Sequence, residues 1–117
     1  MNQGHKDLVV WQKAMTLTTF AYELLRTYPK EELFGLTSQM KRSAVSIPSN
    51  IAEGYGRSTT KDYKHFLSIA YGSALEFDTQ LILGKRLGFG KSISYTKIEA
   101  VLEEVLKMLN SMRKSSY

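Results

Sequence analysis

One stretch in the middle of the chain carries a strict three-then-four spacing of apolar and small residues. Its members are Leu67, Ala70, Ala74, Phe77, Leu81, Gly84 and Gly88. Because an α-helix turns once every 3.6 residues, this spacing places the whole set on one face, whereas a β-strand would scatter it over two faces. The pattern predicts a long amphipathic helix that ends at Gly88, and the small residues Ala70, Ala74 and Gly84 are expected to allow close approach by a neighbouring helix.

Three other stretches show helical periodicity, at about residues 7–28, 36–53 and 94–113. Pro29 ends the first of them, and Thr37 is a candidate N-cap for the second. Thr59, followed three residues later by Asp62, is a variant of the capping box and begins the long helix. The connections are short, so successive helices are expected to be antiparallel. We predict an all-α protein, folded as one up-down-up-down four-helix bundle in a single domain over residues 1–117.

Pro48 lies inside the second predicted helix. Proline lacks a backbone N–H, and its ring clashes with the carbonyl group four residues earlier, which here belongs to Ala44. We therefore expect the helix to be kinked at Pro48. The hydroxyl groups of Ser43, Ser46 and Ser49 are expected to satisfy the backbone groups that the proline frees.

The composition excludes several classes of function. The chain has no cysteine, which rules out disulfide frameworks, Cys-ligated zinc, iron–sulfur clusters and a cysteine nucleophile. His5 and His65 are isolated, and no catalytic motif can be assembled around them, so we assign no catalytic residue, metal or cofactor. No apolar run approaches the roughly 18 residues of a membrane span, and the first residues lack the apolar core of a signal peptide. We expect a non-enzymatic, cytoplasmic protein with no membrane partner.

Basic residues outnumber acidic ones by 16 to 11, a formal net charge of +5. The excess is concentrated in residues 36–66, and a second basic group follows the long helix. These groups predict a surface that binds nucleic-acid phosphates, and the alternative is an ordinary solvated face. Tyrosines 55, 63 and 71 are candidates for base stacking, although packing is the commoner role. The candidate nucleic-acid-binding residues are Lys41, Arg42, Arg57, Lys61, Lys64, Lys85 and Arg86.

A polar stripe runs beside the apolar face of the second helix. It consists of Gln39, Arg42, Ser46, Asn50 and Glu53, at spacings of three or four residues. The stripe could form a hydrogen-bonded network, a subunit interface or a ligand site, and we favour a network or subunit contact that includes Glu76. A buried charge needs a partner, so Arg42 or Arg57 is expected to pair with Glu53 or Glu76.

The run from Ser46 to Gly54, Ser-Ile-Pro-Ser-Asn-Ile-Ala-Glu-Gly, closely resembles the signature of the four-helix-bundle proteins encoded within intervening sequences of bacterial 23S rRNA genes. The similarity covers about Leu8 to Leu87. It includes Leu8-x-Val10-Trp11-Gln12-Lys13-Ala14-Met15 upstream and Tyr63-x-x-Phe66-Leu67-x-Ile69-Ala70-x-Gly72-Ser73-x-x-Glu76 downstream.

The resemblance implies a bundle that assembles as a homopentamer and carries a basic surface suspected of binding RNA. The accessory proteins of diversity-generating retroelements look similar in fold, and they associate with a reverse transcriptase and with nucleic acid. Our first hypothesis is an oligomeric protein that attaches RNA through repeated basic patches. The alternative is a protein–protein adaptor or scaffold, for example for a reverse transcriptase or an RNA-processing enzyme, with little RNA affinity of its own.

Overall fold

The computed structural model describes residues 3–115, apart from the side chains of residues 92 and 93. It contains the helices α1 (Val9–Leu25), α2 (Leu36–Tyr55), α3 (Thr60–Arg86) and α4 (Ser92–Lys114). Short 3-10 turns, η1 (Gly4–Asp7) and η2 (Lys30–Glu32), precede α1 and α2. No strand is present between residues 3 and 115. The predicted all-α class and the four predicted helices are confirmed.

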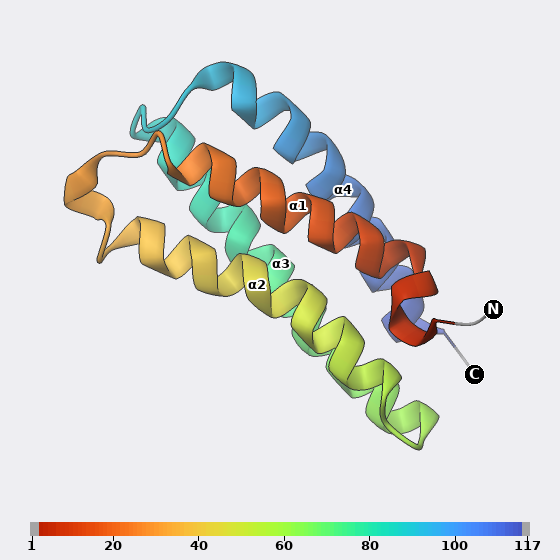
Figure 1. The fold of residues 1–117 in the computed structure, drawn as a ribbon. Helices are drawn as coiled ribbons and strands as arrows, with labels where there is room; N and C mark the ends of the chain where they lie inside the picture. Colours follow the sequence, from red (N-terminus) through yellow and green to blue (C-terminus); the bar gives the residue numbers. More distant parts are fainter. Residues whose placement is uncertain (1–2, 116–117) are drawn as a thin grey trace.

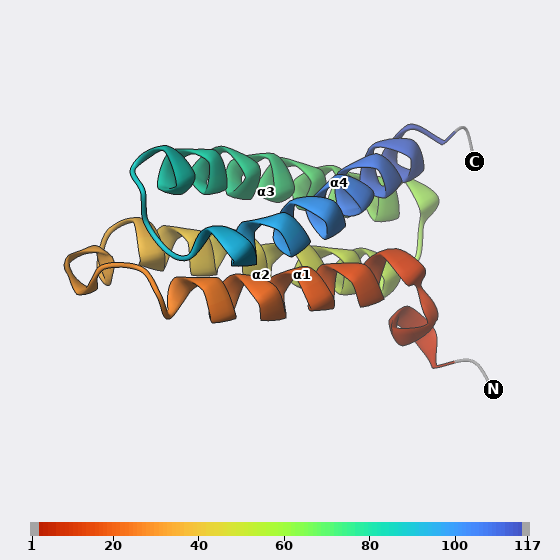
Figure 2. The same cartoon turned by 90° about the horizontal axis from the view of Figure 1, so that it is seen from above.

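The four helices run antiparallel to their neighbours along the long axis of a molecule measuring 43 × 25 × 21 Å (Figures 1 and 2). α1 and α3 each contact α2 and α4, whereas residues 3–115 provide no contact across either diagonal. This arrangement is the predicted up-down-up-down bundle. Both ends of the chain lie at the same end of the bundle as the α2–α3 turn (Figure 1). None of the helices in the described part of the chain is both long and apolar enough to cross a bilayer.

The periodic faces point inward and form one core. In α3, all members of the predicted repeat from Leu67 to Gly84 are buried, and Gly88 lies beyond the helix end. Phe89 N donates to Gly84 O at 3.0 Å, and Gly88 N donates to Lys85 O at 3.1 Å. This pair of bonds is a Schellman motif, and it requires the left-handed conformation that Gly88 adopts at a φ of +76°.

An aromatic contact closes the bundle at the end opposite the termini. Tyr28, which follows α1, packs against Gly84 of α3 so closely that a Cβ added to Gly84 would clash with the hydroxyl oxygen of Tyr28. The hydroxyl groups of Tyr28 and Tyr95 are 2.7 Å apart, and Tyr95 donates to Phe89 O at 2.9 Å. A tyrosine hydroxyl group has one hydrogen. Since Tyr95 donates it to Phe89 O, Tyr28 is the donor in the bond between the two tyrosines. At Gly84 the space left by the missing side chain is therefore filled by Tyr28 and not, as expected, by a neighbouring helix.

The predicted helix caps have different outcomes. Thr59 Oγ1 accepts from Asp62 N at 3.1 Å, which confirms the cap of α3. The prediction that Thr37 caps α2 is wrong, because Thr37 is buried inside the first turn and Gly35 occupies the N-cap position. The carboxylate of Glu32 instead accepts from Leu36 N at 3.3 Å.

Helix α2 continues through Pro48 as a single helix. The carbonyl oxygen of Ala44, freed by the proline, accepts a hydrogen bond from Thr18 Oγ1 on α1 at 3.0 Å. The prediction that serines of α2 satisfy this group is therefore wrong, since Ser43 and Ser46 bond elsewhere. The kink itself stays a prediction.

Candidate functional site

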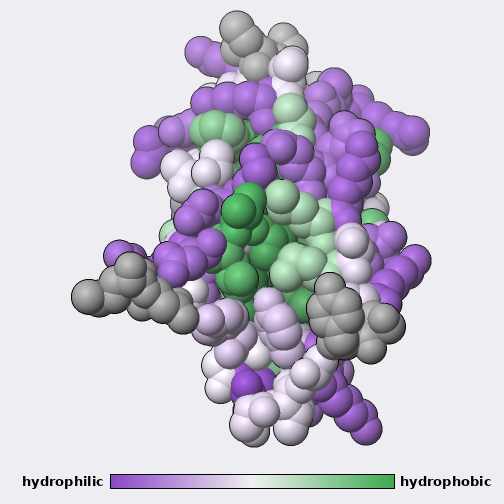
Figure 3. All heavy atoms as spheres, turned by 90° about the vertical axis from the view of Figure 1, so that its right-hand side faces the viewer, coloured by the Kyte–Doolittle hydropathy of each residue, from purple (hydrophilic) through white to green (hydrophobic). Residues whose placement is uncertain are grey.

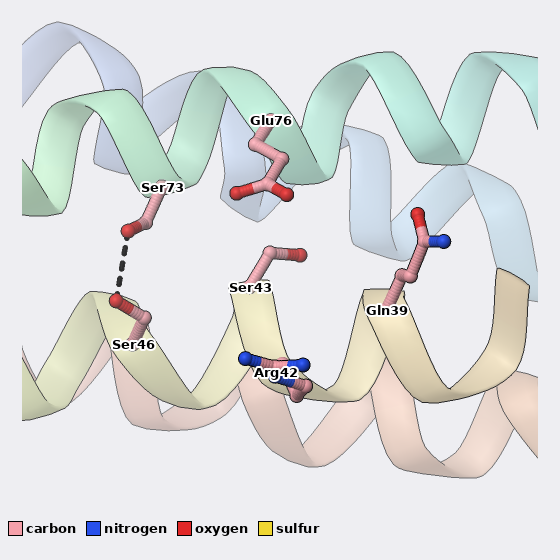
Figure 4. Close-up of a pocket in the computed structure, with 6 residues that line it drawn as sticks. All are labelled: Gln39, Arg42, Ser43, Ser46, Ser73 and Glu76. Atoms are coloured by element: carbon pink, nitrogen blue, oxygen red, sulfur yellow. Dashed lines mark hydrogen bonds between the residues drawn. The ribbon is translucent and has the colours of Figure 1, made fainter. Parts of the chain in front are cut away.

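A polar cavity of about 350 Å³ opens between α2 and α3, and we call it the α2–α3 pocket. Figure 4 shows side chains from the two helices pointing toward one another across it. Helix α2 contributes four of the lining residues and α3 contributes two. The lining consists of Gln39, Arg42, Ser43, Ser46, Ser73 and Glu76.

A chain of hydrogen bonds positions the carboxylate at the pocket wall. Ser43, which is buried, donates to Gln80 Oε1 at 2.7 Å. Gln80 is only 7% exposed, and its Nε2 donates to Glu76 Oε2 at 3.4 Å. Because Ser43 fixes the carbonyl end of the Gln80 side chain, the amide NH2 faces Glu76 and orients its carboxylate.

A second hydrogen-bonded group leaves a donor free in the pocket. Ser46 Oγ and Ser73 Oγ are 2.8 Å apart (Figure 4), and Asn50 Nδ2 donates to Ser46 Oγ at 2.9 Å and to Ser46 O at 2.8 Å. Only one of the two serine hydrogens can lie between the serine oxygens. The other finds no acceptor among the residues that the structure describes, so it is available to a ligand.

The two charges of the pocket are not paired with each other. Arg42 and Glu76 project from α2 and α3 respectively (Figure 4), and among the ion pairs of residues 3–115 none joins them. Of the pairings left open for a buried charge, Arg57 with Glu53 is present at 3.0 Å, but the two side chains are 44% and 55% exposed, so the pair is not a buried one. Glu53 does not line the pocket. The other predicted stripe residues do line it, apart from Asn50, which bonds to Ser46.

Several of the candidate nucleic-acid-binding cations interact within the subunit. Arg57, besides its ion pair, lies over the Phe66 ring at 4.6 Å. Lys85 pairs with Glu99 at 2.9 Å, and Lys64 donates to Ser115 O. Lys41 lies over the ring of Tyr22, at 5.1 Å, on the α1 side of α2. The ion pairs offset the charges of Arg57 and Lys85, and the other contacts engage Lys64 and Lys41 within the chain.

The remaining candidates, Arg42, Lys61 and Arg86, are exposed and have no hydrogen-bond or ion-pair partner in the part of the chain that the structure describes. They are widely separated. Lys61 and Arg86 lie at opposite ends of α3, roughly 37 Å apart at 1.5 Å per residue, and Arg42 lies midway along the bundle on α2. The predicted basic residues therefore do not form one continuous patch on the chain.

The tyrosines suggested as stacking platforms take part in packing. Tyr63 meets Tyr55 edge-on with ring centroids 6.3 Å apart, and burial raises the pKa of Tyr63. Arg113 covers the ring of Tyr71 at 4.4 Å. This geometry favours the packing role for Tyr63 and Tyr71.

Sequence reasoning missed Ser43 and Ser73, which line the pocket, and Gln80, which bonds to Glu76 behind it. A usable signal was present, because Ser73, Glu76 and Gln80 form a polar row at helical spacing on α3. That row matches the polar stripe of α2. Pairing the two rows requires knowing that α2 and α3 are adjacent with these faces turned toward each other.

Apolar side chains are exposed in two grooves. The α1–α2 groove, of about 350 Å³, is lined mainly by Trp11, Met15, Val45, Pro48 and Ala52. Met15 and Val45 are each 42% exposed. The end groove is lined mainly by Leu8, Val9, Val10, Met108 and Met112. Figure 3 shows hydrophobic surface gathered near the middle of this end of the bundle.

Comparisons with known proteins agree with this architecture. The profile of a family described as 23S rRNA-intervening sequence protein matches residues 6–111. A solved structure from the S23 ribosomal protein family of Bacteroides thetaiotaomicron VPI-5482, a protein with unknown function, is similar with a TM-score of 0.82 and 27% sequence identity. The similarity covers 92% of this chain and 100% of that one. No curated protein matches the chain.

Proposed function

The chain belongs to the family of 23S rRNA-intervening sequence proteins, and from that premise we propose that it is a non-enzymatic, oligomeric protein that binds RNA. The observation that carries the proposal is the set of cations without partners, Arg42, Lys61 and Arg86. Lysine and arginine side chains that neutralise phosphates release the counterions condensed on nucleic acid, which favours binding. The bound RNA is held by its backbone, and no base-specific contact is part of the proposal.

Assembly of several subunits would strengthen this binding. The unpartnered cations of one subunit are few and far apart, so a single copy offers a weak site. Five copies in a homopentamer would repeat each cation around the assembly and raise the avidity without any new contact. The exposed α1–α2 groove supports self-association, because a soluble subunit gains free energy by covering such apolar surface.

A salt titration tests the proposal. A stem-loop RNA is titrated with the protein at several salt concentrations, beside a variant carrying Arg42→Gln, Lys61→Gln and Arg86→Gln. We expect log affinity to fall linearly with log salt, and the slope to decrease by about 0.7 to 0.9 for each phosphate that the variant no longer neutralises. The matched control changes Lys13, Lys97 and Lys107 to Gln, which removes the same charge from residues already in ion pairs.

Two results would count against this function. A flat salt response of the unaltered protein would contradict phosphate binding. If the two triple variants lose RNA affinity equally, the net charge of the protein attracts the RNA, and Arg42, Lys61 and Arg86 have no special role.

An adaptor role is the second candidate, and one observation favours it. Phe34, in the connection between α1 and α2, is 94% exposed beside the exposed Leu33. Exposed aromatic side chains are frequent anchors of protein–protein interfaces. A protein partner, such as a reverse transcriptase or an RNA-processing enzyme, that is retained after ribonuclease treatment and released on Phe34→Ser would support the adaptor over direct RNA attachment.

A further inference from the structure

The α2–α3 pocket contains a carboxylate, which a surface that only attaches phosphates would not need. The pocket presents the Arg42 guanidinium and the Glu76 carboxylate without an ion pair between them. A bare anion bound at Arg42 would be repelled by Glu76. The complementary ligand carries an anionic group and, close to it, a hydrogen-bond donor for a carboxylate.

We propose that the α2–α3 pocket is a ribonucleotide subsite, in which Arg42 contacts a phosphate and Glu76 accepts a hydrogen bond from a ribose 2′-hydroxyl. This inference rests on the RNA binding proposed above and adds a preference for RNA over DNA. A ribonucleotide unit has both required groups, whereas deoxyribose lacks the 2′-hydroxyl donor. The planar guanidinium matches phosphate oxygens with two parallel hydrogen bonds.

The carboxylate is preorganised for this role. Ser43 and Gln80 are both buried, and their hydrogen bonds hold the Glu76 side chain toward the pocket. An acceptor fixed before the ligand arrives loses less conformational freedom on binding, so a single hydrogen bond discriminates more strongly. Ser43 and Gln80 are therefore positioning residues for Glu76.

The serine pair supplies the remaining polar contact. The hydroxyl hydrogen left over from the Ser46–Ser73 bond can donate to an oxygen of the sugar or the phosphate. The ligand thus meets a cation, a neutral donor and an anionic acceptor. This combination suits a sugar–phosphate unit better than it suits either a free anion or a free cation.

The test compares one stem-loop sequence made as RNA, as 2′-O-methyl RNA and as DNA with uracil in place of thymine. Dissociation constants are measured by fluorescence anisotropy at low salt. The unaltered protein is expected to bind RNA about tenfold more tightly than 2′-O-methyl RNA, the size of effect typical for a hydrogen bond to a charged group. Glu76→Ala is expected to bring this ratio to about one, because RNA alone loses the hydrogen bond to Glu76, whereas the removal of a negative charge favours the binding of every probe alike.

Two variants complete the design. Glu103→Ala removes an equal charge from an exposed position on α4, so it should raise overall affinity while leaving the ratio unchanged. Arg42→Gln should weaken RNA and DNA equally and reduce the salt slope by about 1. Circular dichroism of each variant confirms that the bundle is folded.

The outcomes separate this inference from the proposed function. Salt-steep binding with equal affinity for RNA and 2′-O-methyl RNA would overturn the subsite and leave the proposed function standing. A preference that survives Glu76→Ala would also overturn it, because the 2′-hydroxyl would then be recognised elsewhere. The absence of salt-dependent binding to any probe would overturn the proposed function itself, and the subsite with it.

Discussion

At the residue scale, Pro48 shows how a local defect is corrected by a distant side chain. The proline leaves Ala44 O without its helical donor, and Thr18 of α1 supplies a replacement by sharing its one hydroxyl hydrogen between Ala44 O and Ala14 O, the latter at 2.9 Å. Leaving a carbonyl group at a helix–helix contact without this partner would cost about 1–3 kcal/mol. The interaction therefore links the stability of α2 to its packing on α1.

Thr18→Val tests this link, because it removes the hydroxyl group and keeps the shape of the side chain. We expect it to lower the free energy of unfolding by about 1–3 kcal/mol. In a Pro48→Ala background the loss should be smaller, since residue 48 then provides its own N–H to Ala44. Urea denaturation of both single variants and the double variant measures the coupling.

Thr19→Val is the matched control for the comparison of Thr18→Val with and without Pro48→Ala. Thr19 Oγ1 donates only to Met15 O of its own exposed helix face, at 2.9 Å. Removing this hydroxyl group should change the free energy of unfolding very little, and the change should be the same whether residue 48 is proline or alanine. Additive effects of Thr18→Val and Pro48→Ala would show that Thr18 does not compensate for the proline.

The Tyr28–Tyr95 contact makes stability depend on alkaline pH. Burial, assisted by donation to Tyr95, raises the pKa of Tyr28 far above its usual value of about 10. Burial also raises the pKa of Tyr95, and the hydrogen bond accepted from Tyr28 partly offsets this. The folded state keeps both protons at a pH where the unfolded chain releases them. The contribution to stability is therefore complete below about pH 10 and is lost as the pH rises through the folded-state values.

Tyr28→Phe should make the free energy of unfolding fall less steeply as the pH rises above about 10. Each fully deprotonating tyrosine contributes up to about 1.4 kcal/mol per pH unit, so unfolding free energies at about pH 8 and pH 11 separate the variant from the unaltered protein. At the lower pH the variant should lose only about 1 kcal/mol, the value of one hydrogen bond, since Tyr95 keeps Phe89 O as its acceptor. Tyr22→Phe, at an exposed tyrosine, is the control. Identical slopes for the two variants would contradict the role of Tyr28.

At the scale of the element, α3 contains glycines with opposite requirements. Gly84 is buried against Tyr28, which leaves no room for a Cβ, whereas a Cβ at Gly72 would have open space around it. Gly54 in α2 is also restricted, because an added Cβ would lie 2.7 Å from Cβ of Phe66. Gly54 lies within α2, and its missing side chain permits the close approach of α3.

Gly84→Ala and Gly72→Ala form a matched pair within one helix. Gly84→Ala should lower the free energy of unfolding by about 1–3 kcal/mol or more. The added methyl group displaces the Tyr28 ring, whose hydroxyl group is bonded to Tyr95. Gly72→Ala should raise the free energy of unfolding by about 0.5–1 kcal/mol, since alanine has fewer conformations than glycine in the unfolded chain and favours the helix. Chemical denaturation midpoints at equal m-values measure both. Shifts of the same sign would refute the proposed close packing at Gly84.

At the scale of the whole molecule, each helix buries one face against its two neighbours and exposes the rest. Most exposed positions are polar, but the α1–α2 groove is not, and it combines side chains from both helices. Contiguous apolar surface rimmed by polar residues is a feature of interaction sites. The proposed homo-oligomer provides a cover for it.

Val45→Glu tests this use of the groove. A charge at the centre of a buried interface would go unpaired, so we expect the assembly to dissociate toward a 13.3 kDa subunit in sedimentation velocity at micromolar concentration. Thr96→Glu adds the same charge at an exposed position of α4 and should leave the assembly intact. If the unaltered protein sediments as a monomer, or Val45→Glu retains the assembly, this groove is not the interface.

The sequence by itself determined the number, order and type of the helices, and which face of each is buried. These properties follow from periodicity, which is local: residues three and four apart share a face wherever the helix lies. The cap of α3 at Thr59 and the Arg57–Glu53 pair could be predicted for the same reason, because each partner lies within one turn.

Only the tertiary structure decided which distant groups meet. Thr18 and Ala44 are 26 residues apart, Ser46 and Ser73 are 27 apart, and Ser43 and Gln80 are 37 apart. The sequence showed a polar stripe on α2, but the pocket exists because a second polar row on α3 faces it. Which cations stay unpaired likewise depended on the neighbouring helix. Periodicity within one helix specifies a face, whereas the rotation and register of two packed helices are set by side-chain interlocking across the whole core.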